Sequence, residues 1–463
     1  MILELLHQHF GLLMLATLVV LLTTGFPVAF TLMGASVGFA LLGSALGFFD
    51  AHWLTALAFR LLGLMNDDLL QAVPVFIYLG VILQRTTLST ELLETMAGLF
   101  GGRAGGLGIS SIVLGVLLAP TTGVVGATVL TIGLLTLPSM LAAGYDRRFA
   151  SGIVCCAGTL GTIIPPSIIL IILSGQMRLA ARDVVAPGGG SISVNFLQIS
   201  LGALLPVAIL LCAYLAYALG VALLAPQASP AIPSQQRPRL TFRRVVVSLV
   251  LPLGLIGLML ASILSGKLYT VEAAAIGAIV ITIYTMFRRE LTWKRLGETV
   301  REVMRLSAVV FTLMMGATTF TLVFRIMGGD ATVTKLLAQI PGGLYGATLL
   351  VLALSLGLCL LLDALEILLV VVPLTMPTLL GLGGDPVWLA VMFAITIQSG
   401  FMVPPSGFAI CFLRSVAPAE VTTQDIYLGV APLLAIQVMV LTLLWTFPSI
   451  ATWLPKAVYG GHA

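Results

Sequence analysis

One seven-residue pattern occurs twice in this chain, each time inside a long apolar segment. The first copy is Gly161-Thr162-Ile163-Ile164-Pro165-Pro166-Ser167, and the second is Gly400-Phe401-Met402-Val403-Pro404-Pro405-Ser406. The copies are 400 − 161 = 239 residues apart. The same offset relates Pro138 to Pro377, Ser139 to Thr378, Gly144 to Gly383 and Asp146 to Asp385. Matches in register over this distance indicate an internal duplication.

Each proline pair must interrupt a helix, because the two rings remove backbone donors and restrict the residues before them. Within hydrocarbon, freed backbone groups are tolerated only where they are buried in protein or line a polar cavity. Interrupted helices at matching places in two repeats are typical of transporter binding sites. Their freed carbonyls suit Na⁺ or H⁺, and their half-helix amino ends suit an anion. The alternative is a pair of structural kinks, since proline is frequent in membrane helices. Two copies in register favour the binding site.

Composition places the repeats in a membrane. Of 463 residues, 59% are hydrophobic and 9% are charged, whereas soluble domains have about 25% charged residues. Long apolar runs predict an all-α polytopic membrane protein and exclude a membrane β-barrel, whose strands alternate. The net charge of +4 belongs to basic loops and does not indicate nucleic-acid binding. Five cysteines in apolar runs, without a Cys-x-x-Cys motif, argue against a disulfide framework or a transition-metal site.

The chain is expected to divide into five consecutive parts. N-terminal and C-terminal scaffold helices enclose two transport repeats, which are separated by further scaffold helices and cytoplasmic basic loops. The first span, residues 10–24, is followed at once by another and is expected to stay as an anchor. The parts are 1–66, 67–176 (first repeat), 177–305, 306–416 (second repeat) and 417–463.

Each repeat is predicted to hold a re-entrant helical hairpin followed by a broken transmembrane helix. Residues 107–143 are interrupted at Ala119-Pro120-Thr121-Thr122-Gly123, which leaves two halves that are short against the ~20 residues needed to cross the hydrocarbon. Residues 342–383 repeat this shape, with a tip near Leu361-Leu362-Asp363. The broken helices that follow are 148–176 and 387–416.

Loop charge predicts that the two repeats are inverted. The loops 226–244 and 288–305 are rich in arginine and are separated by two spans, so both are expected to be cytoplasmic. Counting spans from them places residues 180–196 and 328–341 outside. The first hairpin then enters from the cytoplasm and the second from outside. Five crossings lie between the hairpins, and an odd number inverts the repeat.

These features resemble a known family. Residues from Asp67 (Asp-Asp-Leu-Leu-Gln-Ala-Val-Pro-Val-Phe-Ile-Tyr-Leu-Gly), the Pro120–Pro138 hairpin and both proline breaks resemble the large membrane subunit of TRAP (tripartite ATP-independent periplasmic) transporters, over nearly the whole chain. The resemblance implies an elevator-type, Na⁺-driven importer of organic anions in the bacterial inner membrane. It also implies two partners, a small four-helix membrane subunit and a periplasmic substrate-binding protein. The threonine-rich first tip and the long outward segment 180–196 resemble a branch linked to 2-oxo acids or similar anions.

The resemblance also implies where sodium binds. One Na⁺ would be held by backbone carbonyls at Gly400, Val403 and Pro405. Because the motif is duplicated, another Na⁺ would be held at the corresponding residues Gly161, Ile164 and Pro166. A hard cation prefers oxygen ligands, and an unwound turn supplies carbonyls without a second buried charge.

Five side chains are candidates for the substrate site, and each has a structural alternative. Ser167 and Ser406 offer hydroxyls beside the breaks, or cap the following half-helices. Thr121 and Thr122 offer donors at the first tip, or cap the second hairpin helix. Asp363 is an ionisable group at membrane depth, which indicates function, although aspartate also caps helices. Glu366, one turn further on, is a weaker candidate.

Two other functions remain as alternatives. The first is a stand-alone carboxylate or ion symporter with a related inverted-repeat fold. The second is an intramembrane aspartyl hydrolase using Asp146 and Asp385, which the loop charges disfavour because they place these aspartates on opposite membrane faces. The motif Gly34-Ala35-Ser36-Val37-Gly38 is better explained by helix packing, because all four histidines lie outside the apolar segments.

In the favoured function, the hairpins and broken helices slide against a scaffold formed by 1–66, 197–305 and 426–454.

Overall fold

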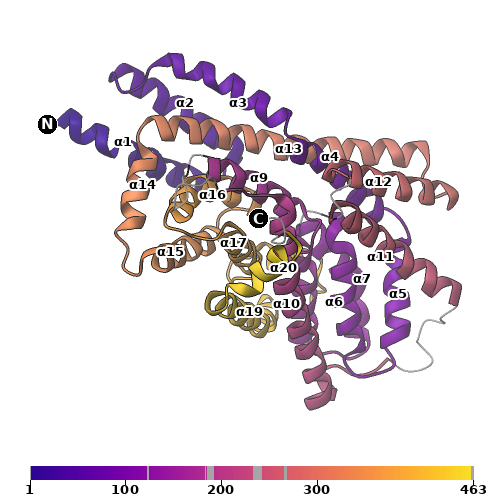
Figure 1. The fold of residues 1–463 in the computed structure, drawn as a ribbon. Coiled ribbons are helices and arrows are strands. Elements are labelled where there is room, and N and C mark those ends of the chain that lie inside the picture. The colour runs from indigo at the N-terminus through magenta and orange to yellow at the C-terminus, as the bar shows by residue number, and fades with distance from the viewer. Residues whose placement is uncertain are drawn as a thin grey trace.

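The computed structural model of this chain describes residues 2–122, 125–182, 184, 192–232, 242–264 and 268–459. Within these ranges the regular structure is entirely helical, as Figure 1 shows. Seven of the described helices are long and apolar enough to cross a membrane, or up to nine spans if two bent helix pairs count as one each. The prediction of an all-α polytopic membrane protein is therefore confirmed.

Two groups of N-terminal helices meet at Asp67. Its side chain accepts a hydrogen bond from the Leu69 N–H and so begins a new helix after Met65. The helices on either side of it are bent by 54°. These elements are α1 (Ile2–Leu22), α2 (Val28–Ala45), η1 (Ala51–Leu54), α3 (Thr55–Met65) and α4 (Asp68–Gln84).

The first repeat contains the predicted hairpin, α6 and α7, and the predicted broken helix, α8 and α9. A short helix, α5, precedes the hairpin and was not predicted. A Gly-rich turn lies between α5 and α6, and its Gly105 has the positive φ (74°) that favours glycine. The elements are α5 (Leu88–Phe100), α6 (Gly106–Thr122), α7 (Val125–Ala142), α8 (Arg147–Thr159), η2 (Leu160–Thr162) and α9 (Ile168–Arg182).

The middle of the chain differs from expectation in one respect. The basic segment 288–305 is mostly helical and continuous with the span after it, because Thr292 caps a 34-residue helix that contains no proline. Much of the predicted outward segment 180–196, the centre of the loop 226–244 and the turn 265–267 lie outside the described residues. The elements are α10 (Phe196–Leu224), η3 (Pro226–Ala228), α11 (Phe242–Leu264), α12 (Thr270–Phe287) and α13 (Trp293–Ile326).

The second repeat contains the second hairpin, α15 and α16, and the second broken helix, α17 and α18. The unpredicted helix α14 packs against α1 and α16. The last predicted helix, 426–454, is interrupted at Phe447-Pro448. The elements are α14 (Gly329–Ala338), α15 (Gly343–Leu358), α16 (Ala364–Gly381), α17 (Pro386–Gly400), α18 (Phe408–Val416), α19 (Thr423–Thr446) and α20 (Ser449–Tyr459).

The two repeats match in detail at the turn before each broken helix. Gly144 and Gly383 both have positive φ, 86° and 90°. Asp146 and Asp385 both cap the helix that follows, each accepting from two backbone N–H groups. Between the hairpins, three described helices, α10, α12 and α13, are long and apolar enough to cross a membrane, and the broken helix α8/α9 and the helix α11 lie there too. Figure 1 places the α6–α7 pair on the right and the α15–α16 pair on the left.

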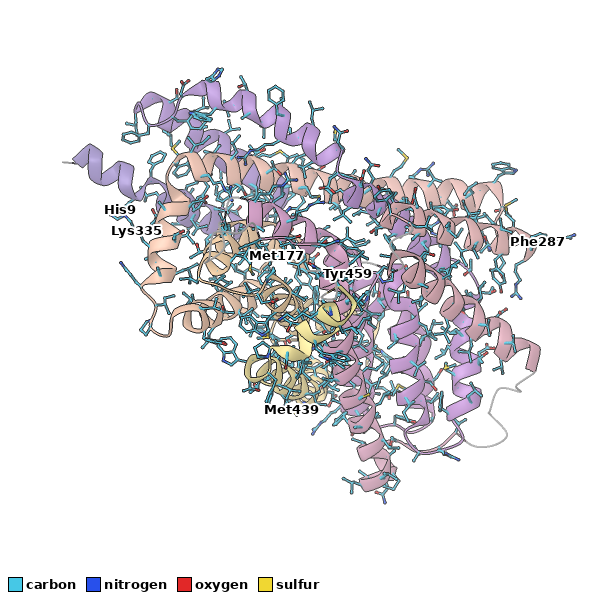
Figure 2. The ribbon with its side chains drawn as sticks, in the orientation of Figure 1. His9, Met177, Phe287, Lys335, Met439 and Tyr459 are labelled. Atoms are coloured by element: carbon cyan, nitrogen blue, oxygen red, sulfur yellow. The ribbon has the colours of Figure 1, made fainter. Side chains whose placement is uncertain are left out.

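Apolar side chains fill the interior of the protein and also cover much of its exterior. Met177 on α9 is fully buried, whereas Phe287 and Met439 are largely exposed, as Figure 2 shows. Exposed apolar side chains occur along many of the described helices. A soluble monomer rarely exposes so much apolar surface, so this exterior fits contact with lipid.

Helices α8 and α19 are joined by an unusually close contact between backbones. A Cβ on Gly152 of α8 would lie 2.1 Å from the carbonyl oxygen of Gly429 on α19. A Cβ on Gly429 would lie 2.0 Å from the carbonyl oxygen of Arg148. Only glycine at both positions allows this approach, so the C-terminal helix is fixed to the first half of the first broken helix.

Candidate functional site

The first break lies between α8/η2 and α9 and is almost completely buried. The Ser167 hydroxyl donates to the carbonyl oxygen of Thr162 (2.5 Å) and accepts from the Leu170 N–H (3.2 Å). Ser167 therefore caps α9 while also tying it to the end of η2. The peptide bond between Pro165 and Pro166 is cis.

The three carbonyl groups expected to hold sodium at this break are not used by the fold. Among the described residues, no hydrogen bond reaches the carbonyl oxygens of Gly161, Ile164 or Pro166. Buried carbonyl groups are normally paired. Three unpaired oxygens around one interruption are therefore suitable ligands for a cation.

The second break, between α17 and α18, differs from the first. Its three expected ligands already accept hydrogen bonds. Gly400 O accepts from the Val403 N–H (3.3 Å), Val403 O from the Gly407 N–H (2.9 Å) and Pro405 O from the Tyr427 hydroxyl (2.9 Å). Each oxygen keeps one further lone pair. Pro405 is exposed and Ser406 is half-buried, so this break is more open than its counterpart. The Pro404–Pro405 peptide bond is also cis.

The two breaks lie against each other. The Thr159 hydroxyl, before the first break, is 3.9 Å from the sulfur of Met402 in the second. The thiol of Cys155 on α8 is 3.7 Å from the carbonyl oxygen of Ala409 on α18. The structure therefore brings the two predicted sodium regions together.

The second hairpin tip packs on the second break. The Ser406 hydroxyl donates to the carbonyl oxygen of Leu360 at the tip (2.8 Å), and a Cβ on Gly400 would lie 2.2 Å from the sulfur of Cys359. On the other side, the first hairpin contacts η2 and α8. Both hairpins and both breaks thus form one continuous region.

The hairpin tips give the candidate side chains structural roles. Asp363 is the N-cap of α16, and its backbone N–H donates to Glu366 Oε2 (2.9 Å), which closes one half of a capping box. The structural alternative therefore accounts for both acids. Thr121 and Thr122 end α6, but their side chains lie outside the described residues, as does the rest of the first tip at 123–124.

The residues of the two enzyme motifs considered in the sequence also have structural roles. One Asp146 carboxylate oxygen accepts from the N–H groups of Arg148 and Phe149, and Asp385 does the same at the start of α17. The Ser36 hydroxyl donates to the carbonyl oxygen of Leu32 within α2. Helix geometry alone explains these side chains.

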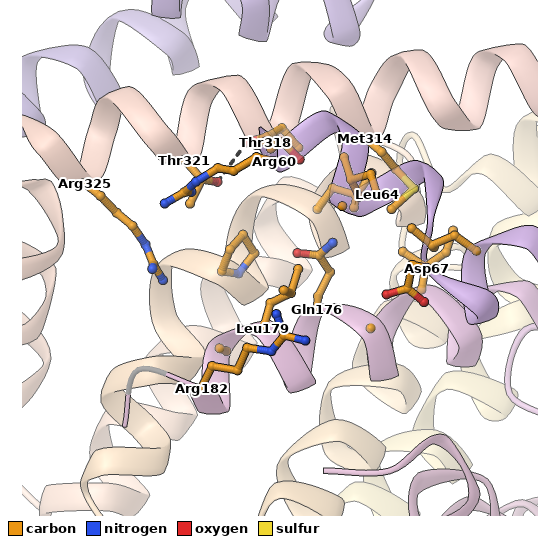
Figure 3. A pocket seen from close by; sticks show the side chains of 18 of the residues that line it. Arg60, Leu64, Asp67, Gln176, Leu179, Arg182, Met314, Thr318, Thr321 and Arg325 are labelled. Atoms are coloured by element: carbon orange, nitrogen blue, oxygen red, sulfur yellow. Dashed lines mark hydrogen bonds between the residues drawn. The ribbon is translucent and has the colours of Figure 1, made fainter. Parts of the chain in front are cut away.

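The structure also contains a cavity that sequence analysis did not predict. Its volume is about 450 Å³, and it lies between α3, α4, α9, α13 and α16 (Figure 3). None of the predicted site residues line it. The only sequence signal for the residues that do line the cavity is the occurrence of charged residues near the outward ends of helices. Its polar lining includes Arg60, Asp67, Gln176, Arg182, Thr321 and Arg325.

Comparison with known proteins agrees with this architecture. Residues 15–450 match the family described as "Tripartite ATP-independent periplasmic transporter, DctM component". The chain is 27% identical over 382 residues to the isethionate TRAP transporter permease protein DctMQ of Oleidesulfovibrio alaskensis, covering 82% of this chain and 57% of that protein. It therefore spans little more than half the length of that relative.

A second relative is matched along most of its length. The chain is 27% identical over 403 residues to the sialic acid TRAP transporter large permease protein SiaM of Vibrio cholerae, covering 87% of this chain and 89% of SiaM. Among solved structures, the YdaH transporter of Alcanivorax borkumensis superposes with a TM-score of 0.63 and 16% identity, covering 88% of this chain and 90% of YdaH. At that identity the superposition shows the fold alone.

Proposed function

Since this chain belongs to the DctM-component family of tripartite ATP-independent periplasmic transporters, we propose that it is the translocating subunit of a sodium-coupled importer of an organic anion. It acts as a multi-pass protein of the bacterial inner membrane and is not an enzyme. Its partners in this proposal are a small four-helix membrane subunit and a periplasmic substrate-binding protein. Residues at and beside the two breaks bind the cation and the cargo.

One observation carries the sodium proposal. The carbonyl oxygens of Gly161, Ile164 and Pro166 have no hydrogen bond among the described residues, although the first break is buried. Leaving such groups unpaired costs free energy of about 1–3 kcal/mol each. A bound Na⁺ would offset that cost, as it does where broken helices of transporters expose their carbonyls.

The substrate class rests on weaker support. The two relatives above are named for isethionate and for sialic acid. The first is a sulfonate and the second a carboxylate, so a small organic anion is the class that they share. A 2-oxo acid fits this class and remains the more specific proposal.

The elevator movement needs two bodies that slide past each other. The glycine contact between α8 and α19 favours placing α19 in the moving body, together with the hairpins and the broken helices. This differs from the initial allocation of residues 426–454 to the scaffold. Helices α2 and α13, which pack on each other, would belong to the stationary body.

Reconstitution tests the proposal directly. The chain and its membrane partner are placed in liposomes with the binding protein outside, and uptake of labelled carboxylates, 2-oxo acids and sulfonates is measured. We expect uptake only with an inward Na⁺ gradient and only with the binding protein present. Equal uptake when K⁺ replaces Na⁺ would contradict the proposed sodium coupling. Uptake without the binding protein would indicate the stand-alone symporter, and peptide cleavage lost in Asp146→Asn would indicate the hydrolase.

A further inference from the structure

The cavity between α3, α9 and α13 carries an excess of positive charge. Arg60, Arg182 and Arg325 line it together with one acid, Asp67, a formal charge of 3 − 1 = +2. Two of these lining residues have ion-pair partners: Asp67 pairs with Arg178, and Arg325 pairs with Asp330 at 3.0 Å. When both partners are counted, four arginines and two aspartates still give a formal charge of 4 − 2 = +2. In Figure 3 the three lining arginines extend from three different helices toward the same space.

A buried amide also points into this space. Gln176 is only 8% exposed, and its side chain makes no hydrogen bond to any described residue. Figure 3 shows it directed from α9 toward the middle of the cavity. Its amide atoms are not among the fully buried polar atoms that lack a partner in the described residues, so they face the open space of the cavity. Gln176 is therefore a donor and acceptor held ready for a polar ligand.

The floor of the cavity has room for a ligand. Gly175 and Gly63 line it, and a Cβ at either position would meet nothing within 4 Å. Cavities of about 300–1,000 Å³ are usual for small-molecule sites, and this one has about 450 Å³. Leu64, Leu179 and Met314 supply apolar surface beside the charged groups.

The loop charges place this cavity on the outward side. Arg182 ends α9, before the segment predicted to face outward, and Arg325 lies in the last turn of α13. Arg60 and Arg182 are exposed, so the mouth of the cavity is open. Along α9, Gln176 is nine residues after Ser167, a rise of about 13 Å. The cavity is thus separate from the break itself and lies outward of it.

We propose that this cavity is a capture site for the anionic group of the substrate, a carboxylate or sulfonate, between its release outside and its arrival at the breaks. Guanidinium groups bind both anions through paired hydrogen bonds. Gln176 and Thr321 bind neutral polar groups of the same molecule. The site rests on the proposed transport function but makes a claim of its own, since it assigns three arginines that no transport motif includes.

A thiol at the cavity floor tests the claim without a transport assay. Gly175→Cys is introduced after Cys212 and Cys411, the exposed cysteines, are replaced by alanine. Intact cells are then treated with two membrane-impermeant methanethiosulfonates, one bearing a 2-sulfonatoethyl group and one a trimethylammonioethyl group. We expect the sulfonate reagent to react faster, relative to a free thiol, by about tenfold. Succinate in the medium should slow its reaction.

Charge variants show whether the arginines are responsible. Arg182→Gln should lower the ratio of sulfonate to ammonium labelling roughly fivefold, the size expected for one nearby charge after screening by salt. Arg182→Lys should keep the ratio, and so should Arg103→Gln, in the turn between α5 and α6. Gly297→Cys, at the start of α13 where a Cβ also meets open space, should not react from outside.

The outcomes separate this proposal from the transport proposal. A thiol at position 175 that does not react from outside, or a ratio that ignores Arg182→Gln, overturns the capture site even if Na⁺-driven uptake is found. The expected labelling supports the site even if uptake does not need Na⁺. Purified chain in vesicles with and without phosphatidylglycerol identifies the source of the anion. If that lipid protects the thiol and succinate does not, the cavity binds lipid headgroups and the proposal is wrong.

Discussion

The serine that follows each proline pair has a different environment in the two repeats. Ser167 is buried and bonded on both sides, to the Thr162 carbonyl and the Leu170 N–H, so it stabilises both ends of the interruption. Ser406 is half-buried and bonds across to the hairpin tip at Leu360. The same residue type therefore acts as a helix cap in one repeat and as a contact between elements in the other.

Removing the buried cap should cost stability. We expect Ser167→Ala to destabilise the fold by about 1–2 kcal/mol, because the Leu170 N–H loses its acceptor and the helix loses its cap. Thermal unfolding in detergent would show a lower midpoint. Ser406→Ala is the matched control and should lower the midpoint less. Equal shifts would contradict the assignment of the cap to the first repeat.

At this scale the sequence predicts where the chain breaks but not what each oxygen does there. A proline pair stops a helix through its own covalent structure, which is why both breaks occur where expected. Whether a carbonyl is left unpaired depends on distant neighbours. The Tyr427 hydroxyl, from a helix after the second repeat, occupies Pro405 O, and nothing local to the break indicates it.

At the scale of whole helices, the close contact between α8 and α19 constrains how the first broken helix packs. We expect Gly152→Ala to push these helices apart and to destabilise the fold by about 2 kcal/mol or more, since a Cβ there would overlap the Gly429 carbonyl. Gly220→Ala on α10, where a Cβ meets nothing within 4 Å, is the control. It should be neutral or slightly stabilising, because alanine favours a helix. Similar melting midpoints for the two variants would mean that the helices are not in close contact.

A second connection between elements lies in the turn before α13. Glu290 accepts from the hydroxyl and the N–H of Thr87 and from Arg288, which also pairs with Glu91 on α5. Burial alone would raise the pKa of the Glu290 carboxyl, but these hydrogen bonds outweigh it and the pKa is lowered. A carboxyl with a lowered pKa stabilises the fold above its unfolded pKa and loses this effect as pH falls through its folded pKa.

This linkage gives a pH-dependent prediction. Glu290→Gln should lower the melting midpoint at pH 7, and the difference from the unmodified chain should shrink as pH falls through the lowered folded pKa of Glu290, below which both side chains are uncharged. Glu302→Gln, on the basic start of α13, is the control and should show a smaller effect. A deficit for Glu290→Gln that is constant with pH would show that its charge does not matter.

Helices were predicted well where they are long and apolar, and less well where they are short. Helices α5 and α14 are too short or too polar to resemble spans, and they are held by packing against α6 and α16. The basic segment before the span was interpreted as a separate element because charge suggested a loop. A capping threonine and the absence of proline let α13 run through it instead.

At the scale of the whole molecule, the duplication was accessible from sequence because it rests on an exact offset, and the inversion stays a prediction from loop charge. The arginine-lined cavity was not accessible from sequence. Its walls come from α3, α4, α9, α13 and α16, which are far apart in the chain. No local sequence pattern indicates that these helices meet around one cavity.

Inversion makes a prediction about sidedness. Ala142 and Gly381 are repeat partners, 381 − 142 = 239, and each is the exposed last residue of the second helix in its hairpin. In intact cells an impermeant thiol reagent should label Gly381→Cys and not Ala142→Cys. In inside-out vesicles the result should reverse. Labelling of both from one side would mean that the repeats are not inverted.

The central claim is that the paired proline breaks hold sodium, and sodium-dependent stability tests it most directly. With Na⁺ at ten times its dissociation constant, binding adds about 1.4 kcal/mol of stability, so the melting midpoint should rise in NaCl relative to KCl. Pro165→Ala with Pro166→Ala, and Pro404→Ala with Pro405→Ala, allow each helix to use its own carbonyls, so each pair should reduce the rise and both together should abolish it. A midpoint that is the same in NaCl and KCl, or a full sodium effect after both breaks are replaced, would contradict the account.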